Sequence, residues 1–549
     1  MYLDTFLMRI SYIFFLGLSL LLLSCSEQDK PANDIFRYNE SKGISTLDPA
    51  FAKSQTIIWP VSQLFNGLVQ MNENTEIEPC IAKNWTISED GKTYTFILKK
   101  NVFFHKHPLL KDNRKLVAQD FIYSLKRLFD PKVASPGAWL MNYLDKDTLD
   151  NGFVAPNDST LIIQLKQAFP GFLGILSMPY CSVVPKEVVE YYGKAFRNHP
   201  IGTGPFYLKK WREGEKLVLR KNNRYFEKDQ KGKQLPYLEG IAIRFISDKQ
   251  SEFLEFSKGK IDFISGVHVS YKDKLLTRSG ELKTKYKSKI RMIKSPYLNT
   301  EYLGFLVSSE QSAVRSIYIR KAINFGFDRK KMLSYLRNNI GIPAEQGFIP
   351  KGLPSFDENN KGFIYNKDSA LYYLNLFEKK YGKIPSITLT TTSDYVDLCE
   401  YIQHELSEIG FSINIDISSG ATFRDQVATS KLEFFRGSWI ADYPDAENYL
   451  SLFYSKNFAP NGPNYTHFRD TYYDQLYEQA LVETRDSLRY EIYKKMNQIL
   501  INEAPLVPLF YDEAVRFSQK NIHNFNTNAM NMLFLKTVYK TINKSIKAE

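Results

Sequence analysis

Two carboxylates, Asp442 and Asp445, end an apolar run of the sequence. The run "KLEFFRGSWIA" (residues 431–441) predicts a strand over residues 432–440, and a proline lies between the two acids. A carboxylate at the mouth of a buried strand can pair with a cationic ligand, or it can serve a turn, because Asp is favoured before turns that contain proline. The residues alone leave both interpretations of Asp442 open. Asp445 is expected to be the N-cap of a helix over residues 446–454.

The elements that lead to Asp442 alternate between strand and helix. Apolar residues with period two predict strands, and a period near 3.6 predicts helices. In chain order we expect a strand over 386–391, a helix over 394–409, a strand over 411–417, a helix over 421–430 and the strand over 432–440. Such a β-α-β-α-β unit forms a parallel sheet, and open α/β sheets bind ligands beyond the carboxyl ends of their strands. Asp442 is therefore expected at the edge where ligands bind.

Further elements are expected on both sides of this unit. Helical patterns cover residues 54–71 and 117–131, and a long helical zone covers 472–502. Strands are expected over residues 93–98, 159–165, 217–220, 240–246 and 504–511. This mixture of strands and helices, with one parallel unit, predicts the α/β fold class.

The composition of the 549 residues is that of a globular protein, with 43% hydrophobic and 24% charged residues. At roughly 150 residues per domain, this length predicts two to four domains. The formal net charge is +12, which can indicate binding to nucleic acid or to anionic lipid. The lysines are scattered among Asn, Ile, Phe and Tyr, so we interpret the charge as a compositional bias and expect no nucleic-acid partner.

The N-terminus predicts export from the cytoplasm. Residues 10–23 form a 14-residue apolar run, which is too short for a spanning helix of about 20 residues and typical of a signal peptide. The run ends in "LLSC", which resembles the lipobox of bacterial lipoproteins and implies that Cys25 is lipidated after removal of residues 1–24. The alternative is an ordinary signal peptide with an incidental cysteine. Residues 25–33 are expected to form a tether.

The sequence contains no pattern that is typical of a catalytic or metal site. It has no Gly-rich phosphate loop and no G-x-S-x-G motif, and His105 and His107 alone make a weak metal site. Cys80, Cys181 and Cys399 can form at most one disulfide, and their spacing matches no metal site. We therefore expect a protein that is not an enzyme and that has no cofactor and no metal.

Several segments in a fixed order resemble one family. Two segments carry most of the resemblance, "IAKNWTISEDGKTYTFILKKNVFFH" (residues 81–105) and "LVAQDFIYSLKRLFDP" (116–131). Further matching blocks lie at residues 199–226, 253–263, 319–333 and 504–525. Together they resemble the extracellular solute-binding proteins of family 5, the peptide-binding components of ABC transporters.

This resemblance implies a two-lobed clamshell of the periplasmic-binding-protein type (type II) with an additional domain. By the same resemblance, lobe II covers residues 298–505, which contain the β-α-β-α-β unit, and the additional domain covers 76–199. Lobe I is expected to combine residues 34–75, 200–297 and 506–540. The two lobes of such a protein close over the ligand by hinge motion.

The resemblance also implies ligand-binding roles near Asp442. In peptide-binding members an Asp three residues after a Trp pairs with the α-ammonium group of the ligand, and Trp439 and Asp442 match this pattern. The backbone groups of Ser438, Ile440 and Ala441 are expected to bind the peptide main chain. An enclosed ammonium group needs such a partner, because an isolated buried charge is costly.

Further site residues follow from the resemblance. Arg436 lies where oligopeptide-binding members place an Arg that can meet a ligand carboxylate, although its strand position also allows a structural ion pair. Phe51, Ala52 and Lys53 belong to a segment that resembles the edge of the cleft in lobe I, with core packing as the alternative for Phe51. One departure is Ile440, where some enteric members have a Cys and a disulfide in lobe II.

These expectations combine into one function. We expect a monomeric, lipid-anchored receptor of the cell envelope, periplasmic or displayed at the cell surface, that delivers peptides to an ABC permease in the inner membrane. One alternative is the same scaffold with another ligand, such as a cell-wall peptide, a nickel chelate, haem or a sugar. Another is a lipoprotein with an enzymatic or adhesive role.

Overall fold

A computed structural model describes residues 34–541 apart from 112, 148, 269 and 311. The predicted signal peptide, the tether and Cys25 lie outside the described residues. Within the described part of the chain, no helix combines the length and the apolar character needed to cross a membrane.

The first sheet has four strands in the order β1-β10-β9-β8. β1 (Ile35–Asn39) pairs in parallel with β10 (Gly240–Arg244), whereas β9 (Lys216–Lys221) and β8 (Phe206–Arg212) continue the sheet in antiparallel fashion. The strands predicted over 217–220 and 240–246 are thus confirmed. Aromatic rings of this part form a buried cluster, in which Phe263 lies 5.6 Å from Phe36 and 5.0 Å from Phe525 between ring centroids.

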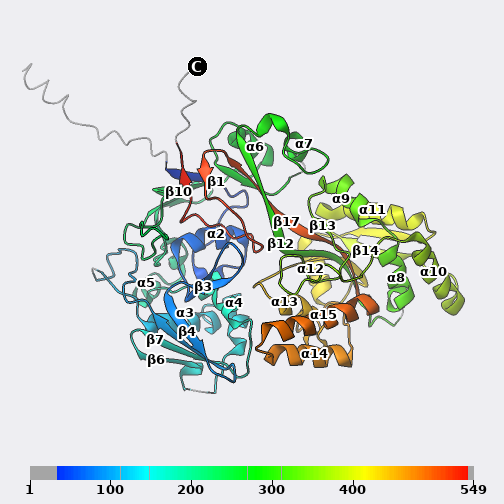
Figure 1. Ribbon diagram of the computed structural model, residues 1–549, viewed down its shortest axis with the longest axis horizontal. Helices are drawn as coiled ribbons and strands as arrows, with labels where there is room; N and C mark the ends of the chain where they lie inside the picture. The colour runs from blue at the N-terminus through cyan, green and yellow to red at the C-terminus, as the bar shows by residue number, and fades with distance from the viewer. Residues whose placement is uncertain (1–33, 112, 148, 269, 311, 542–549) are drawn as a thin grey trace, which may run out of the picture.

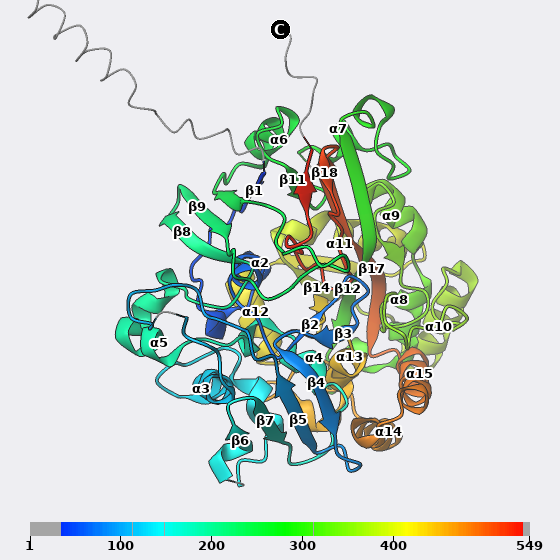
Figure 2. The same cartoon turned by 60° about the vertical axis from the view of Figure 1, so that its left-hand side comes forward.

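A second four-stranded sheet has the order β4-β5-β7-β6 and is wholly antiparallel. Its strands are β4 (Ala82–Ile87), β5 (Thr93–Leu98), β7 (Thr160–Gln164) and β6 (Phe153–Asn157). Helix α3 (Ala118–Phe129) buries Phe121, Leu125 and Leu128 in the same core cluster as these strands. Figure 2 shows this sheet and α3 together at one end of the molecule.

The largest sheet follows the order β11-β17-β12-β16-β14-β15 and is dominated by two long strands. β12 (Ile290–Phe305) and β17 (Leu506–Gln519) pair in antiparallel fashion, with register shifts between Pro296 and Thr300 and again between Glu301 and Tyr302. In Figure 1 these two strands lie between the two halves of the molecule. β11 (Phe263–Ser265) extends the sheet towards the first half.

The predicted β-α-β-α-β unit is confirmed. Its elements are β14 (Ile387–Thr391), α11 (Val396–Ser407), β15 (Ile413–Ile417), α12 (Gly420–Ala428) and β16 (Phe434–Ile440). β14 pairs in parallel with β15 and with β16. The carboxyl end of β16 therefore leads directly to Asp442, as the sequence pattern predicts.

Two predicted helices differ from the structure. The helix expected over 54–71 is shorter in the structure, where α2 covers Gln55–Leu64. Beyond it, the carbonyl of Asn66 accepts a hydrogen bond from the N–H of Val183, so the helix does not continue. The chain then forms β2 (Val69–Met71), which pairs with β3 (Ile77–Pro79). Apolar spacing cannot distinguish these outcomes, because the long-range partner of Asn66 lies far along the chain.

The helical zone predicted over 472–502 is two helices, α14 (Thr471–Val482) and α15 (Asp486–Glu503). The remaining described helices and short strands are α4 (Phe172–Leu176), α5 (Lys186–Tyr192), α6 (Lys249–Ser257), α7 (Lys272–Leu275), α8 (Ile317–Phe325), α9 (Arg329–Arg337), β13 (Ile342–Pro343), α10 (Lys367–Tyr381), α13 (Glu447–Leu450), β18 (Ile522–His523) and β19 (Tyr539–Lys540).

Candidate ligand-binding cleft

A cavity of about 500 Å³ lies where three distant parts of the chain meet. One wall is α2 with residues 65–71 and the segment 530–536, and a second wall is residues 177–182 next to α4. The third wall is the end of β16 with Ile440, Ala441 and Asp442. Small-molecule sites in proteins occupy about 300–1,000 Å³, so this cavity has the size of a ligand site.

Asp442 presents an unpaired carboxylate to this cavity. Its side chain is open to the solvent of the cavity, while surrounding protein partly buries it and so raises the pKa of the carboxyl group. A hydrogen bond with Asn448 opposes this shift. Within the described part of the chain Asp442 forms no ion pair, so a cation bound here would supply the missing counter-charge.

Asp445 has its partners inside the protein. Its carboxylate accepts the N–H of Glu447 at 2.8 Å and lies 3.4 Å from the guanidinium of Arg489. The helix expected over 446–454 is shorter, since α13 covers Glu447–Leu450 and a 3-10 turn covers Ser451–Phe453. The formal N-cap position is Ala446 rather than Asp445, but the Asp445 carboxylate still satisfies one of the first free N–H groups of the helix.

Trp439 and Asp442 share one partner. Asn448 accepts hydrogen bonds from Trp439 Nε1 at 3.0 Å and from the backbone N–H of Asp442 at 3.1 Å. Trp439 and Ser438 do not line the cavity, whereas Ile440, which is 50% exposed, and Ala441 do. Asn448 thus fixes the chain at the point where β16 ends.

The main chain at the end of β16 has one free edge. On one side, residues 437–440 pair with β12, from Tyr302 to Asn299. On the other side, β14 pairs with β16 at Phe435 alone. In the described part of the chain, residues 437–440 therefore have no strand partner on that side, and an extended ligand can align there.

Arg436 does not line the cavity. Its guanidinium forms an ion pair with Glu301 on β12 and stacks 3.2 Å from the ring centre of Tyr395. Glu301 also accepts the side-chain amide of Asn299 at 3.0 Å. The structure thus gives Arg436 the structural ion pair that its position on a strand allows.

The three residues expected at the cleft edge of lobe I, Phe51, Ala52 and Lys53, differ in their surroundings. Ala52 and Lys53 line the cavity, and Phe51 packs half-buried against the core of the β4–β7 sheet. Asp48 accepts the N–H of Ala50 at 3.0 Å and so begins the short 3-10 helix Pro49–Phe51 before Lys53. Lys53 is exposed and forms no ion pair in the part of the chain that the structure describes.

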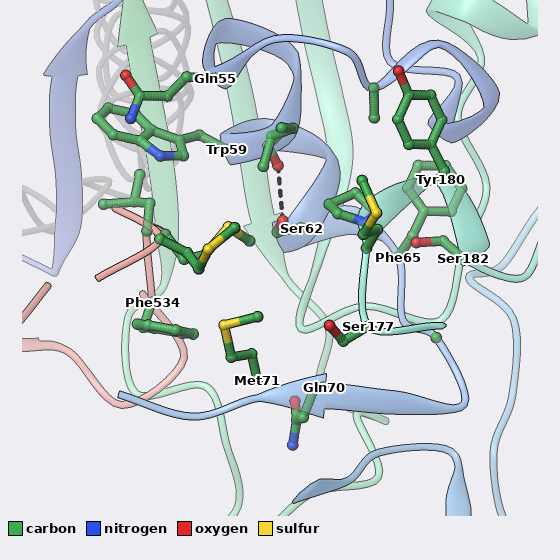
Figure 3. Close-up of a pocket in the computed structure, with 18 of the residues that line it drawn as sticks. Gln55, Trp59, Ser62, Phe65, Gln70, Met71, Ser177, Tyr180, Ser182 and Phe534 are labelled. Carbon is green, nitrogen blue, oxygen red and sulfur yellow. Dashed lines mark hydrogen bonds between the residues drawn. The ribbon is translucent and has the colours of Figure 1, made fainter. Parts of the chain in front are cut away.

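Most lining residues were missed by the sequence analysis. Many are apolar or aromatic, among them Trp59, Phe65, Met71, Trp139, Met178, Tyr180, Tyr297, Met530, Met532 and Phe534, and others are polar, among them Gln55, Ser62, Gln70, Ser177 and Ser182. Figure 3 shows Trp59, Met71 and Phe534 directed towards one open space. A local signal exists in the alternation of Met530, Met532 and Phe534, but the same alternation is typical of a core strand.

The cysteines and histidines considered in the sequence do not come together in one site among the described residues. Cys80, Cys181 and Cys399 are buried and unpaired, and burial raises the pKa of the Cys80 thiol in the cavity wall to about 12. His105 is buried against the carbonyl of Gly204, whereas His107 contacts the hydroxyl of Tyr192. Among the described residues no cluster of three or more His, Cys, Asp or Glu side chains can hold a metal.

Known proteins resemble this chain in sequence and in fold. The family model of the bacterial extracellular solute-binding proteins, family 5 (middle), matches residues 76–461. The dipeptide-binding protein DppE of Bacillus subtilis is 24% identical, with 95% of this chain and 97% of the relative covered. The "probable deoxycholate-binding periplasmic protein YgiS" of Escherichia coli is 26% identical over 93% and 95% of the two chains.

A solved structure shares the fold. The periplasmic binding protein DppA of Helicobacter pylori, in complex with the peptide STSA, superposes with a TM-score of 0.75 at 24% identity, covering 92% of this chain and 98% of that chain. The predicted two-lobed α/β clamshell of type II is therefore confirmed. The relatives are binding proteins of transporters rather than enzymes. The chain belongs to the bacterial extracellular solute-binding proteins of family 5.

Proposed function

We propose that the protein captures peptides in this cleft and delivers them to an ABC import permease. The observation that carries the proposal is the unpaired carboxylate of Asp442 at the cavity wall. It pairs with the α-ammonium group of the peptide, and the free edge of residues 437–440 bonds to the peptide main chain. Main-chain bonds of this kind hold any side-chain sequence, so the charge fixes the register of the peptide.

In this proposal, each part of the clamshell supplies a different wall of the cavity. Lobe I (34–75, 200–297 and 506–540) and the additional domain (76–199) supply two walls, and lobe II (298–505) supplies Asp442. Lys53 in the cavity wall is suited to a ligand carboxylate, because its ammonium group forms no ion pair in the described part of the chain. A monomeric receptor with its N-terminus anchored at Cys25 is part of this proposal.

The alternative ligands fit the cavity less well. Bile acids and the periphery of haem carry carboxylates and no ammonium group for Asp442, whereas every peptide with a free amino terminus carries one. A buried carboxylate without a counter-charge is costly. The geometry thus favours a peptide over an anionic apolar ligand.

The test is calorimetry of peptide binding to the Asp442→Asn variant. We expect the affinity to fall at least about tenfold, roughly 1.4 kcal/mol, because the neutral amide leaves the ammonium group without its counter-charge. N-acetylation of the peptide is expected to weaken binding to the wild-type protein in the same way. Unchanged affinity in both experiments would rule out the proposed role of Asp442.

Asp445→Asn is the matched control. It removes a carboxylate three residues away that is engaged with Glu447 and Arg489. We expect this variant to unfold at a lower temperature and to bind peptide with wild-type affinity. An equal loss of affinity in both variants would show that the loop, and not the charge of Asp442, controls binding.

A further inference from the structure

The segment 530–536 forms an extended wall of the cavity with two different faces. Met530, Met532 and Phe534 are half-buried, whereas the alternate residues Leu533 and Leu535 are buried and belong to the core cluster of the first sheet. All residues of the segment line the cavity. The alternation therefore places two thioethers and one aromatic ring on the side that remains accessible.

Hydrogen bonds from the first lobe hold this segment in place. Trp59 Nε1 donates to the carbonyl of Asn531 at 2.9 Å, and Gln63 Nε2 donates to that of Leu533 at 2.8 Å. The guanidinium of Arg516 donates to the carbonyls of Asn531 at 3.0 Å and of Met532 at 2.7 Å. Because α2 and β17 are themselves buried, the side chains of the segment project from a fixed main chain.

Phe534 leaves its main chain free. In the described part of the chain neither its N–H nor its carbonyl oxygen has a hydrogen-bond partner. One residue of an antiparallel pair exchanges both of these bonds with its neighbour. Phe534 therefore offers a donor and an acceptor that the main chain of an extended ligand can use.

Few charged side chains in the cavity wall are free to pair with a ligand. Lys536 lines the cavity, but its ammonium group is engaged by Glu227 and by Gln70 Oε1, the latter at 3.0 Å. Asp442 and Lys53 are the lining charges without an ion pair among the described residues, and they suit the two termini of a peptide. No charge is left there to pair with a charged peptide side chain.

Four methionines line the cavity, namely Met71, Met178, Met530 and Met532. The methionine side chain is unbranched and polarisable, so it adapts to apolar groups of different shape and makes favourable contacts with aromatic rings. Phe534 lies beside Met71 and Trp59 lies across the open space from it (Figure 3), and both provide aromatic surface. Such a wall stabilises bound apolar side chains of a ligand by burying their surface, and it does not require one particular side-chain shape.

We propose that the cleft selects peptides with apolar side chains, aliphatic and aromatic alike, through the methionines of the segment 530–536. The proposal rests on the proposed function, since it assumes that the ligand is a peptide held by its amino terminus. A charged side chain at the same position would lose its hydration without gaining a partner. Met530 and Met532 are thus specificity-determining residues.

The test measures affinity by calorimetry for tripeptides of the form Ala-X-Ala and Ala-Ala-X with a free amino terminus. We expect peptides with Phe, Leu or Met at X to bind at least about tenfold more tightly than those with Asp or Lys, at one or both positions. In the double variant M530Q/M532Q this preference is expected to shrink several-fold, because the amide groups retain water. Met292→Gln is the control, since Met292 is half-buried outside the cavity.

The outcomes separate this proposal from the proposed function. Equal affinity for apolar and charged peptides, or an unchanged preference in the folded M530Q/M532Q variant, overturns the proposed selectivity. N-acetylated Ala-Phe-Ala tests the proposed function independently. If it binds as well as the free peptide while the preference for Phe persists, the role of Asp442 fails and the selectivity of the cleft stands. Thermal unfolding of each variant identifies any loss that is due to misfolding.

Discussion

At the scale of single residues, the loop after β16 and the first residue of α13 hold three carboxyl groups with three different environments. Asp442 faces the cavity without an ion pair among the described residues, and Asp445 is engaged by the α13 backbone and Arg489. Glu447 is 4% exposed and accepts hydrogen bonds from the hydroxyl groups of Tyr443 and Tyr477. Neutral donors stabilise a buried carboxylate less than a cation does, so burial raises the pKa of Glu447 despite its two hydrogen bonds.

Glu447 makes the stability of the protein depend on pH. Burial, with a smaller contribution from the charges of Asp445 and Asp442, raises the pKa of this carboxyl group to about 7 against the opposing effect of the hydrogen bonds from Tyr443 and Tyr477. The folded state therefore binds the proton more tightly than the unfolded state does. The stabilisation is complete below the pKa of about 4.5 of the unfolded state and is lost as the pH rises through about 7.

We expect the free energy of unfolding of the wild-type protein to fall between pH 5 and pH 8 relative to that of Glu447→Gln. The difference is of the order of a few kcal/mol at most, because the amide has no proton to lose at this site. Urea unfolding at several pH values measures it. Glu503→Gln changes a glutamate at the end of α15 and serves as the control. A constant difference between wild type and Glu447→Gln across this range would contradict the raised pKa.

At the scale of elements, Tyr443, the residue after Asp442, packs the loop that follows β16 against the β4–β7 sheet and its helices, here called the β4–β7 body. Tyr443 is 2% exposed and belongs to the core cluster of that body, with its ring 6.2 Å edge-to-face from Phe169. The ring passes close to Gly171 and Gly174, where an added Cβ would lie 3.3 and 3.2 Å from Tyr443. The carboxylate proposed to bind the ligand and the contact between the two bodies are thus adjacent in sequence.

Substitution of Gly174 is expected to weaken peptide binding indirectly. The branched side chain of Gly174→Val displaces Tyr443 and lowers the population of the arrangement in which the walls of the cavity meet. The apparent dissociation constant rises in proportion to that loss, and we expect a change of about three-fold to thirty-fold by calorimetry. Gly420→Ala is the control, because only Arg424 lies within 4 Å of its added Cβ. Wild-type affinity in a folded Gly174→Val protein would show that the contact does not control binding.

Local patterns sufficed for some elements and failed for others. The β-α-β-α-β unit could be predicted because each strand and helix has its own apolar period, and its parallel pairing follows from the crossover. The partner of Arg436 could not be predicted, since Glu301 lies 135 residues away and many acids compete for that role. Asp442 was singled out through its place after a strand together with the family resemblance, whereas the four methionines line one cavity from residues 71, 178, 530 and 532, a proximity that no local period encodes.

At the scale of the whole molecule, two long strands connect the two halves on either side of the cavity. β12 and β17 run from the first half of the molecule into the second, with register shifts near Pro296 and Glu301 (Figure 1). Such irregularities bend a strand and increase its twist, which is compatible with the hinge motion expected for a two-lobed binding protein. The chain segments that form the cleft are far apart in sequence, so the relative position of Asp442 and the segment 530–536 depends on β12 and β17 and on the packing of Tyr443 against the β4–β7 sheet.

The last prediction concerns how the whole molecule is held in the envelope. The apolar run 10–23 is short for a spanning helix and is followed by Cys25 and a polar stretch, so attachment is expected to depend on lipid at that thiol. Each buried CH₂ of an acyl chain contributes about 0.8 kcal/mol to membrane binding. Cys25→Ser should therefore move the protein from the membrane fraction to the soluble fraction without changing its affinity for peptide. Fractionation of cells with the Cys80→Ser protein is the control for loss of a thiol, and a Cys25→Ser protein that stays with the membrane would refute lipidation as the anchor.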